Sequence, residues 1–314
     1  MFEPSTLKER RQYYREEWSV KDLPKFITEN IHKREFGFDH NGTGPNDRYK
    51  VFFNERVLKK FLRAKTPFAG YISVAFYNEP KHRQDWQKSE FVFDIDAKDM
   101  PIRSCNCDNV CEICLGEALE LARIYIDTLK GDLGLKNIHL VYSGRGYHIR
   151  VLDQFIMEEE AELRGEVLKY VVGAGVPTKE RRDIPLGYTN LFNNNLVRNI
   201  CHITGKEKIE GINPKLLKDI IKNRNQIEKD KNGNYQLGIF RSKIGPRRYE
   251  NLLDAMARIN LSMADGKVTI DLKRILRLPS SLHSKVSMRC VEVKNSNTFD
   301  PFKHAIPKFV QERI

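Results

Sequence analysis

Four cysteines within ten residues are the feature that most constrains how this chain folds. They are Cys105, Cys107, Cys111 and Cys114, spaced as C-x-C-x3-C-x2-C, whereas Cys201 and Cys290 stand alone. The charged N-terminus predicts no export signal, and thiols this close in such a chain favour a metal site over disulfide bonds. Four thiolates complete a tetrahedral Zn2+ site and leave no position for water. The spacing therefore predicts a structural zinc knuckle at 105–114, the alternative being four reduced thiols in a loop.

Length and composition set the class of protein. At 314 residues with 40% apolar residues, the chain is long enough to bury a core without disulfide bonds. No apolar run approaches the roughly 20 residues of a membrane span. We therefore expect a globular protein of the cytoplasm, associated with the nucleoid and with no membrane partner.

Positive charge is concentrated at the C-terminal end of the chain. The formal net charge is +12, and the last 48 residues, 267–314, hold 10 basic and 4 acidic side chains. Such a segment attracts polyanions, although a solvated basic face with no partner has the same composition.

Hydrophobic periodicity predicts an α/β protein with a helical insertion. Strand-like patterns and helix-like patterns alternate, with the tightly spaced cysteines between the second strand and the third helix. We expect an α/β catalytic domain at 1–155 and 263–314, which includes the knuckle, and a smaller, mainly helical domain at 156–262. The expected strands are 71–76, 90–96, 138–142, 147–152 and 268–271, and the expected helices are 7–18, 22–33, 115–131, 157–173, 214–226 and 249–259.

Asp94 and Asp96 are the first candidate site residues. Side chains two apart on a strand project from the same face, so the two carboxylates stand together while Phe93 and Ile95 point into packing. Two adjacent ionised carboxylates repel each other, and a hard cation such as Mg2+ or Mn2+ removes that cost. Taken alone, Asp-x-Asp is a weak signal, and without further context an ordinary strand end with two solvated aspartates is the favoured interpretation.

Two further segments carry groups that bind phosphate. The loop 143–146, Ser-Gly-Arg-Gly, joins two predicted strands of a hairpin and is followed by His148. Its glycines permit close backbone approach, and its arginine offers a forked cation. The segment 271–285 begins with an acid and then supplies basic groups. A plain turn and a basic surface segment are the structural alternatives. The candidates in these segments are Ser143, Arg145, His148, Asp271, Arg277, His283 and Lys285.

Together these motifs resemble the small catalytic subunit of archaeal and eukaryotic DNA primase. The resemblance lies in the order of four motifs along the chain. They are Asp94-Ile95-Asp96, the cysteine cluster, Ser-Gly-Arg-Gly-Tyr-His148, and the segment from Asp271 through Leu-Pro-Ser-Ser-Leu-His283-Ser-Lys285. The N-terminal segments Tyr13-Tyr14 and 34–38, Arg-Glu-Phe-Gly-Phe, look like further family segments. The short, Arg-Gly form of the hairpin is closer to the archaeal members.

The resemblance implies a function and a set of roles. It implies a mixed-sheet primase catalytic domain and template-directed nucleotidyl transfer that makes short primers on single-stranded DNA from NTPs or dNTPs. Asp94, Asp96 and Asp271 match the carboxylates that hold two Mg2+ or Mn2+ ions. The residues that match the segments contacting the phosphates of the incoming nucleotide are Ser143, Arg145, His148, Arg277, His283 and Lys285. The cysteines match the zinc knuckle, and a large primase subunit is the implied partner.

Two other functions are compatible with parts of the pattern. A repair-type primase-polymerase or end-joining polymerase shares the carboxylates, but a four-cysteine knuckle is not expected there. A zinc-dependent RNA-binding module explains the cysteines and the basic charge, but it leaves three separated aspartates without a role. Primer-independent synthesis distinguishes the first, and nucleotide incorporation with Mn2+ or Mg2+ distinguishes the second.

Overall fold

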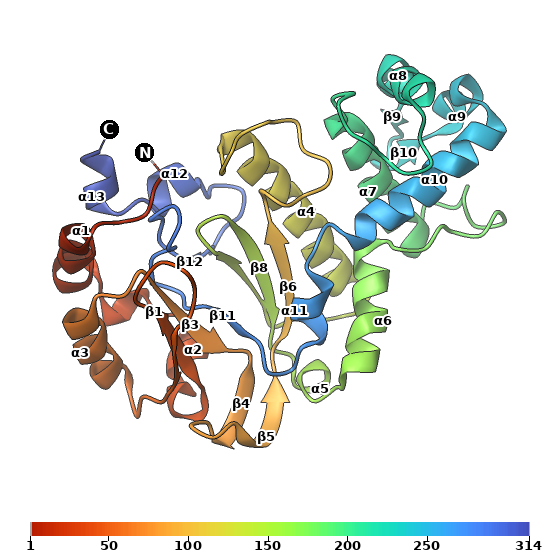
Figure 1. Cartoon of the computed structure of the whole chain (residues 1–314). Coiled ribbons are helices and arrows are strands. Elements are labelled where there is room, and N and C mark those ends of the chain that lie inside the picture. Colours follow the sequence, from red (N-terminus) through yellow and green to blue (C-terminus); the bar gives the residue numbers. More distant parts are fainter. Residues whose placement is uncertain (1, 314) are drawn as a thin grey trace. The chain divides into compact units, whose positions relative to one another are not determined.

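The computed structural model describes residues 2–313 as two compact units (Figure 1). The first unit comprises residues up to Asp94, Asn137–Arg164 and the chain from Lys267 onward, and the second comprises Ile95–Lys136 and Gly165–Gly266. The first is an α/β unit and the second is mainly helical, so the expected mixture of a sheet-containing part and a helical part is confirmed. No helix within the described residues is long and apolar enough to cross a membrane.

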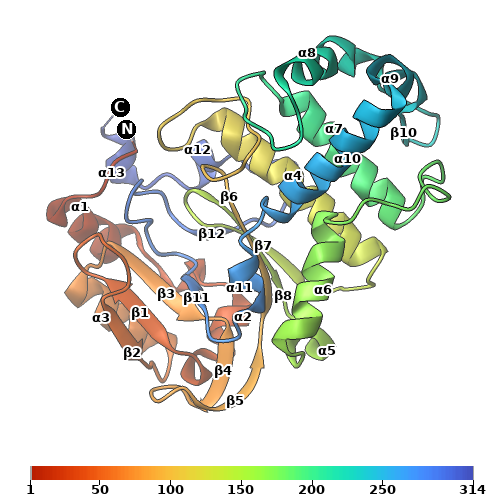
Figure 2. The same cartoon turned by 45° about the vertical axis from the view of Figure 1, so that its right-hand side comes forward.

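One sheet, formed mainly by the first unit, carries the predicted site residues Asp94, Asp96 and His148. Its strand order is β12-β7-β8-β6, and Figure 2 shows these strands next to one another. The predicted hairpin is confirmed, since β7 and β8 pair antiparallel with Tyr142 opposite Tyr147. The sheet is buried on both faces where the consecutive β6 residues Phe91, Val92 and Phe93 lie, which accounts for their unbroken apolar run. The strands are β6 Phe91–Asp96, β7 Ile138–Tyr142, β8 Gly146–Val151 and β12 Val291–Glu292.

A second sheet of the first unit has the order β11-β3-β1-β2, beside the hairpin β4-β5. A buried cluster of Val74, Val92, Val268 and Leu276 lies in the core of this unit. The remaining strands are β1 Phe36–Asp39, β2 Asp47–Lys50, β3 Ala69–Ser73, β4 Ala75–Glu79, β5 Gln84–Ser89 and β11 Ile275–Arg277. The helices are α1 Leu7–Gln12, α2 Lys25–Thr28, α3 Glu55–Lys65, α5 Gln154–Met157, α12 Pro301–His304 and α13 Lys308–Gln311.

The second unit is built from long helices and one small hairpin. Buried leucine, isoleucine and phenylalanine side chains line the inner faces of its helices, as in other helical bundles. The helix α6 continues from the first unit into the second, and α11, Gly266–Ile270, returns the chain to the first. The elements are α4 Glu112–Gly131, α6 Ala161–Val172, α7 Tyr188–His202, α8 Pro214–Asn223, β9 Glu228–Lys229, β10 Tyr235–Gln236, α9 Gly238–Ile244 and α10 Pro246–Leu261.

Two local predictions are wrong. Residues 268–271 are not a strand, because Gly266–Ile270 is the helix α11, which buries Val268 in the core cluster. The predicted helix 22–33 is broken at Pro24, which cannot donate to a helical hydrogen bond. The structure has short helices there instead, at Val20–Asp22, Lys25–Thr28 and Ile31–Lys33.

The helix α7 is absent from the expected helices, because its several asparagines are typical of a loop. Asparagine competes with the helical backbone for hydrogen bonds, so its helix propensity is low. In the structure the buried Asn195 donates to the carbonyl of Val172 at 3.3 Å, and Asn199 donates to the side chain of Asn260 at 2.8 Å. These tertiary hydrogen bonds stabilise a helix that the local sequence does not favour.

The compact units differ from the predicted domain division. The division at 156 and 262 kept the cysteine segment with the α/β domain, whereas the structure groups 95–136 with the helical unit. Arg198 of α7 is buried and donates to the carbonyl of Glu117 in α4 at 2.9 Å, which ties α4 to the helices. Independent folding of either part stays a prediction.

Candidate active site and cysteine centre

Asp94 is a carboxylate held in its ionised form on β6. Its side chain is 26% exposed, and its Oδ1 lies 3.4 Å from Nε2 of His148 on the neighbouring strand β8. Burial disfavours the charge, but His148, followed by Arg274 and Arg277, keeps the pKa of Asp94 below its usual range. An ionised, partly exposed carboxylate of this kind is suited to binding a cation.

Asp96 lies two residues further along the same strand. Alternation places its carboxylate on the same side of β6 as that of Asp94. Its Oδ1 accepts a hydrogen bond from the backbone N–H of Lys98 at 3.0 Å. The strand and the shared face expected from Asp-x-Asp are therefore present, and metal binding by the pair stays a prediction.

The glycine loop packs directly against the C-terminal basic segment. Gly144 has a φ of +103°, and a Cβ at this position would lie 2.5 Å from the Cβ of His283. The Tyr142 hydroxyl donates to the Gly144 carbonyl at 2.8 Å, and the backbone N–H of Ser143 donates to the Gly146 carbonyl at 2.9 Å. Only glycine fits at this position, and it lets the loop pack against His283, which is far away in the sequence.

Positive charge converges around His283. This imidazole is buried, and burial, followed by Arg277, Arg145 and Lys285, lowers the pKa of His283 well below its usual value. His283 is therefore neutral at pH 7 and accepts the backbone N–H of Lys285 at its Nδ1, 3.2 Å away. The structure brings together the predicted phosphate-binding side chains of the hairpin and of the segment 277–285. Clustered guanidinium and ammonium groups favour a bound polyanion.

Asp271 occupies a different local structure from the one expected. It follows α11 instead of ending a strand, its side chain is exposed, and its Oδ1 accepts the backbone N–H of Lys273 at 2.9 Å. Within residues 2–313, the four cysteines form a group of metal-ligating side chains whose ligand atoms all lie within 4.8 Å of one another. The approach of Asp271 to the β6 carboxylates stays a prediction.

A buried ion triad supports the strand that carries Asp94, and the sequence analysis missed it. Glu90 is fully buried, with Nε of Arg150 at 2.5 Å and Nη2 of Arg34 at 2.8 Å. The guanidinium groups of Arg34 and Arg150 lie over the rings of Phe76 and Phe26 at 4.2 Å and 5.2 Å. Burial disfavours the charge of Glu90, but Arg150 and then Arg34 keep its pKa below the usual range.

The only local signal of this triad is a charged residue inside each apolar run. Glu90 precedes Phe-Val-Phe, Arg150 lies within β8, and Arg34 precedes β1. Glu90 directly precedes β6 and Arg150 lies on β8, so the triad links the two strands that carry Asp94 and His148.

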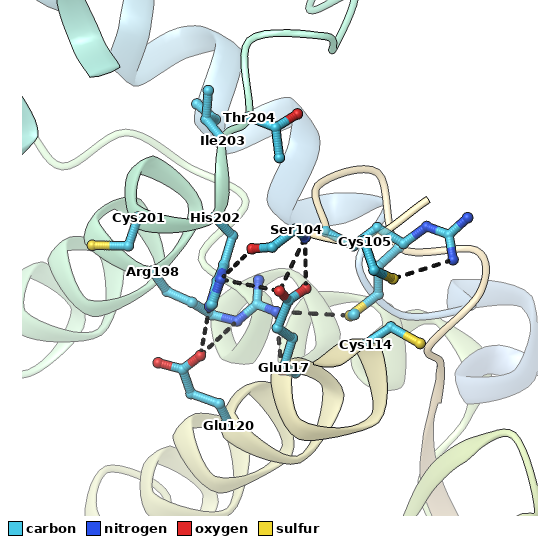
Figure 3. Close-up of polar contacts among 12 residues, drawn as sticks. Ser104, Cys105, Cys114, Glu117, Glu120, Arg198, Cys201, His202, Ile203 and Thr204 are labelled. Atoms are coloured by element: carbon cyan, nitrogen blue, oxygen red, sulfur yellow. Dashed lines mark hydrogen bonds and ion pairs between the residues drawn. The ribbon is translucent and has the colours of Figure 1, made fainter. Parts of the chain in front are cut away.

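The four cysteines form a compact set in the second unit, and Figure 3 labels two of them, Cys105 and Cys114. The sulfur of Cys107 lies 3.6 Å from that of Cys105 and 3.8 Å from that of Cys114, and Cys111 lies 3.9 Å from Cys114. Sulfurs of a regular tetrahedron with Zn–S bonds of about 2.3 Å lie about 3.8 Å apart, so the spacing fits zinc. Burial raises the pKa of the Cys114 thiol, and a bound metal would have to displace that proton.

A charged clamp that the sequence analysis missed lies beside the cysteines. His202, at the end of α7, has Nδ1 3.2 Å from Glu117 and Nε2 2.8 Å from Glu120, both on α4 (Figure 3). The hydroxyl of Ser104, next to Cys105, lies 3.1 Å from Nδ1, and the backbone N–H of Ser104 donates to Glu117 at 3.0 Å. Glu117, followed by Glu120, raises the pKa of His202 to about 9. The clamp ties the start of the cysteine loop to two helices.

Comparison with known proteins identifies the family. The family model described as DNA primase small subunit matches residues 93–294. A DNA primase small subunit of Methanobrevibacter smithii is 62% identical over 100% of this chain and 99% of its own length. The corresponding proteins of Methanothermobacter thermautotrophicus and Thermococcus kodakarensis are 55% and 42% identical, over 100% and 98% of this chain and 99% and 94% of theirs.

These relatives are all archaeal, and they cover the acidic strand, the glycine hairpin, the cysteines and the basic segment in one alignment. That agrees with the archaeal resemblance noted from the sequence, and it does not favour a repair-type polymerase. The chain therefore belongs to the DNA primase small-subunit family, and it is a nucleotidyltransferase that synthesises primers.

Proposed function

We propose that Asp94, Asp96 and Asp271 hold two divalent ions at the polymerising centre. The observation that carries this proposal is the ionised, partly exposed carboxylate of Asp94 beside His148 in a unit rich in basic groups. Carboxylate oxygens are the ligands that Mg2+ and Mn2+ prefer, and such ions retain sites for phosphate oxygens. When bound, the ions activate the 3′-hydroxyl of the growing strand and neutralise charge on the phosphates.

The nucleotide triphosphate would be held by the hairpin and the C-terminal segment. Arg145 and Arg277 offer forked donors, and Lys285 adds an exposed ammonium group. The neutral imidazole of His283 can donate one hydrogen bond to a phosphate oxygen without adding a full charge. Ser143 and His148 would complete the set, with His148 also orienting Asp94. Positioning and charge neutralisation are the main contributions a protein makes to phosphoryl transfer.

Zinc is the proposed metal of the cysteine cluster, with Cys105, Cys107, Cys111 and Cys114 as ligands. The sulfur spacing supports this assignment, and a four-cysteine site has a structural role. The single-stranded template would be contacted mainly through its backbone, so affinity should fall as salt rises. A large primase subunit would complete the enzyme as a heterodimer, and we place the complex at the nucleoid in the cytoplasm.

The test of the metal assignment is primer synthesis by a double variant. Asp94→Ala combined with Asp96→Ala should abolish primer synthesis on a single-stranded template in Mg2+ or Mn2+, while the circular dichroism spectrum and the unfolding midpoint change little. Asp254→Ala, at an exposed acid of α10, is the charge-matched control and should keep wild-type activity. Synthesis retained by the double variant would contradict the proposal.

A second assay separates a primase from a polymerase that requires a primer. The protein, with and without the large subunit, is given template and nucleotides but no primer. Products that begin with a nucleoside triphosphate are expected. Extension that occurs only when a primer is added would instead favour a repair-type polymerase.

A further inference from the structure

The second unit contains an enclosed pocket that the polymerising centre does not use. A cavity of about 210 Å³ lies among the loop before α7, the strand β10 and the helices α9 and α10. Every lining residue belongs to the second unit. The volume is below the roughly 300–1,000 Å³ of pockets that hold drug-sized ligands, so it suits a single ring system.

Aromatic side chains form the walls of this pocket. Phe192 and Tyr249 are buried, while Tyr235 on β10 is partly exposed at its mouth. The ring of Tyr249 packs edge-on against Phe240 with centroids 6.3 Å apart, so this wall is anchored in the core. Flat rings at a cavity wall offer stacking surfaces to any nucleobase, because every base has a π-face.

Two amide side chains lie among these rings. Asn193 and Gln236 line the cavity. The amino group of Gln236 donates to Asp230 at 3.3 Å, which orients the amide at the surface. An amide presents donors and an acceptor side by side, the pattern by which Asn and Gln contact base edges.

Charge at the pocket is positive on one side. Arg241 is exposed, lines the cavity and lies 5.8 Å above the ring of Tyr249. The stretch 235–248 carries four basic residues and no acidic residue. Arg182, by contrast, is held by Glu250 with both oxygens at 2.6 Å, and Asp183 lies on that side. A phosphate would therefore be attracted toward Arg241 and away from Asp183.

We propose that this pocket binds an unpaired nucleobase, stacked on Tyr235 and Tyr249, with its phosphate toward Arg241. The base could belong to single-stranded nucleic acid or to a free nucleotide, which share this chemistry. The site is additional to the nucleotide site of the polymerising centre. Binding needs no divalent ion, because no carboxylate pair takes part, and this separates it experimentally from the catalytic proposal.

The first test is photo-cross-linking in a buffer without Mg2+, Mn2+ or any chelator, so that zinc on the cysteines is retained. The full-length protein is irradiated with a 5-iodouracil-containing single-stranded oligonucleotide, and the modified peptides are mapped by mass spectrometry. Modification of Tyr235 or Tyr249 is expected, and excess ATP reduces it only if a free nucleotide competes for the pocket. Cross-links confined to the first unit would overturn the proposal and leave the catalytic assignment intact.

The second test measures affinity for the same oligonucleotide by fluorescence anisotropy, again without Mg2+, Mn2+ or a chelator. Tyr235→Ala should weaken binding about five- to hundredfold, the range expected for one lost base stack. Arg241→Ala should reduce the slope of log affinity against log salt by about 1, as for one lost phosphate contact. Lys231→Ala, an exposed residue of the same hairpin outside the pocket, is the charge control.

A third variant blocks the cavity without removing any of its groups. A Cβ added at Gly238 meets no atom within 4 Å, so Gly238→Leu can be accommodated and would fill space at the pocket lining. Gly131→Leu, at an equally open helical glycine outside the pocket, is the matched control. Gly238→Leu should weaken oligonucleotide binding relative to Gly131→Leu, and equal affinity of the two variants would overturn the proposal.

Discussion

The two metal centres predicted from the sequence differ in how they are assembled. The four cysteines lie within one short loop, and their sulfurs already stand at distances that suit zinc. The carboxylates come from β6 and from a segment after α11, so only tertiary structure can bring them together. A local site is specified by spacing, whereas a distributed site depends on every element between its parts.

The charged groups that support the two centres differ in burial. Glu90, Arg34 and Arg150 have no exposed side-chain surface, while His202 is 20% and Glu120 is 49% exposed. Removing one member of a fully buried set leaves an uncompensated charge, and removing a member of a half-exposed set leaves a charge that water can solvate. Removing a charged partner near β6 should therefore lower the free energy of unfolding by a large amount, and removing one near the cysteines should lower it by a small amount.

The largest expected effect is on catalysis through Asp271. Asp271→Asn removes the charge of one proposed metal ligand, and primer synthesis should fall by about a thousandfold, equivalent to about 4 kcal/mol of transition-state stabilisation. The unfolding midpoint should not change, because this side chain is exposed. Initial rates on a single-stranded template give the measurement. A loss below tenfold would show that the carboxylate site does not include Asp271.

The next effect is on stability at the buried triad. Glu90→Gln leaves two guanidinium groups without their carboxylate and should lower the free energy of unfolding by about 3–5 kcal/mol in urea titrations. Glu166→Gln is the matched control, since its ion pair with Lys169 is exposed and should contribute less than about 1 kcal/mol. Equal effects at the two positions would remove the proposed contrast between buried and exposed networks.

The sequence predicted local features well. The Asp-x-Asp strand, the hairpin and the helix after the cysteines follow from residue periodicity over a few positions. The contact between Gly144 and His283 was expected only as a shared function, but its tightness explains the glycine. Such motifs can be predicted from the sequence because each lies within a single short segment.

Features that depend on contacts between residues far apart in the sequence could not be predicted from it. The helix α7 requires Asn199 to bond Asn260, and α11 forms because Val268 fills a core cluster contributed by other segments. The clamp at His202 and the triad at Glu90 also join residues from separate elements. Tertiary contacts outweighed the local preference of asparagine for loops and of Val-Thr-Ile for strands.

A smaller effect than those at Asp271 and Glu90 is expected for zinc affinity in the second unit. Cys114→Ser should weaken zinc binding by more than about 100-fold, because structural sites draw roughly 10–16 kcal/mol from four ligands. Cys201→Ser, at an exposed cysteine outside the cluster, should leave the affinity and the stoichiometry unchanged. Competition with a chromogenic chelator measures both quantities. Unaltered binding by Cys114→Ser would refute the four-cysteine assignment.

The smallest effect is expected at the clamp, and its pH dependence identifies the cause. Glu117 and then Glu120 raise the pKa of His202 from 6.5 to about 9, with Arg198 opposing them. Because the folded-state pKa is raised, the clamp contributes fully below pH 6.5 and its contribution disappears as pH rises through 9. His202→Gln should lower the free energy of unfolding by about 1 kcal/mol at pH 6, since water screens the half-exposed Glu120.

At pH 10 wild type and His202→Gln should unfold at the same urea concentration. Glutamine keeps a hydrogen-bonding group near Ser104 but cannot carry the charge, so the variant isolates the electrostatic part of the clamp. A difference that stays constant from pH 6 to pH 10 would mean that packing, not the ion pair with Glu117, holds the cysteine loop to α4 and α7.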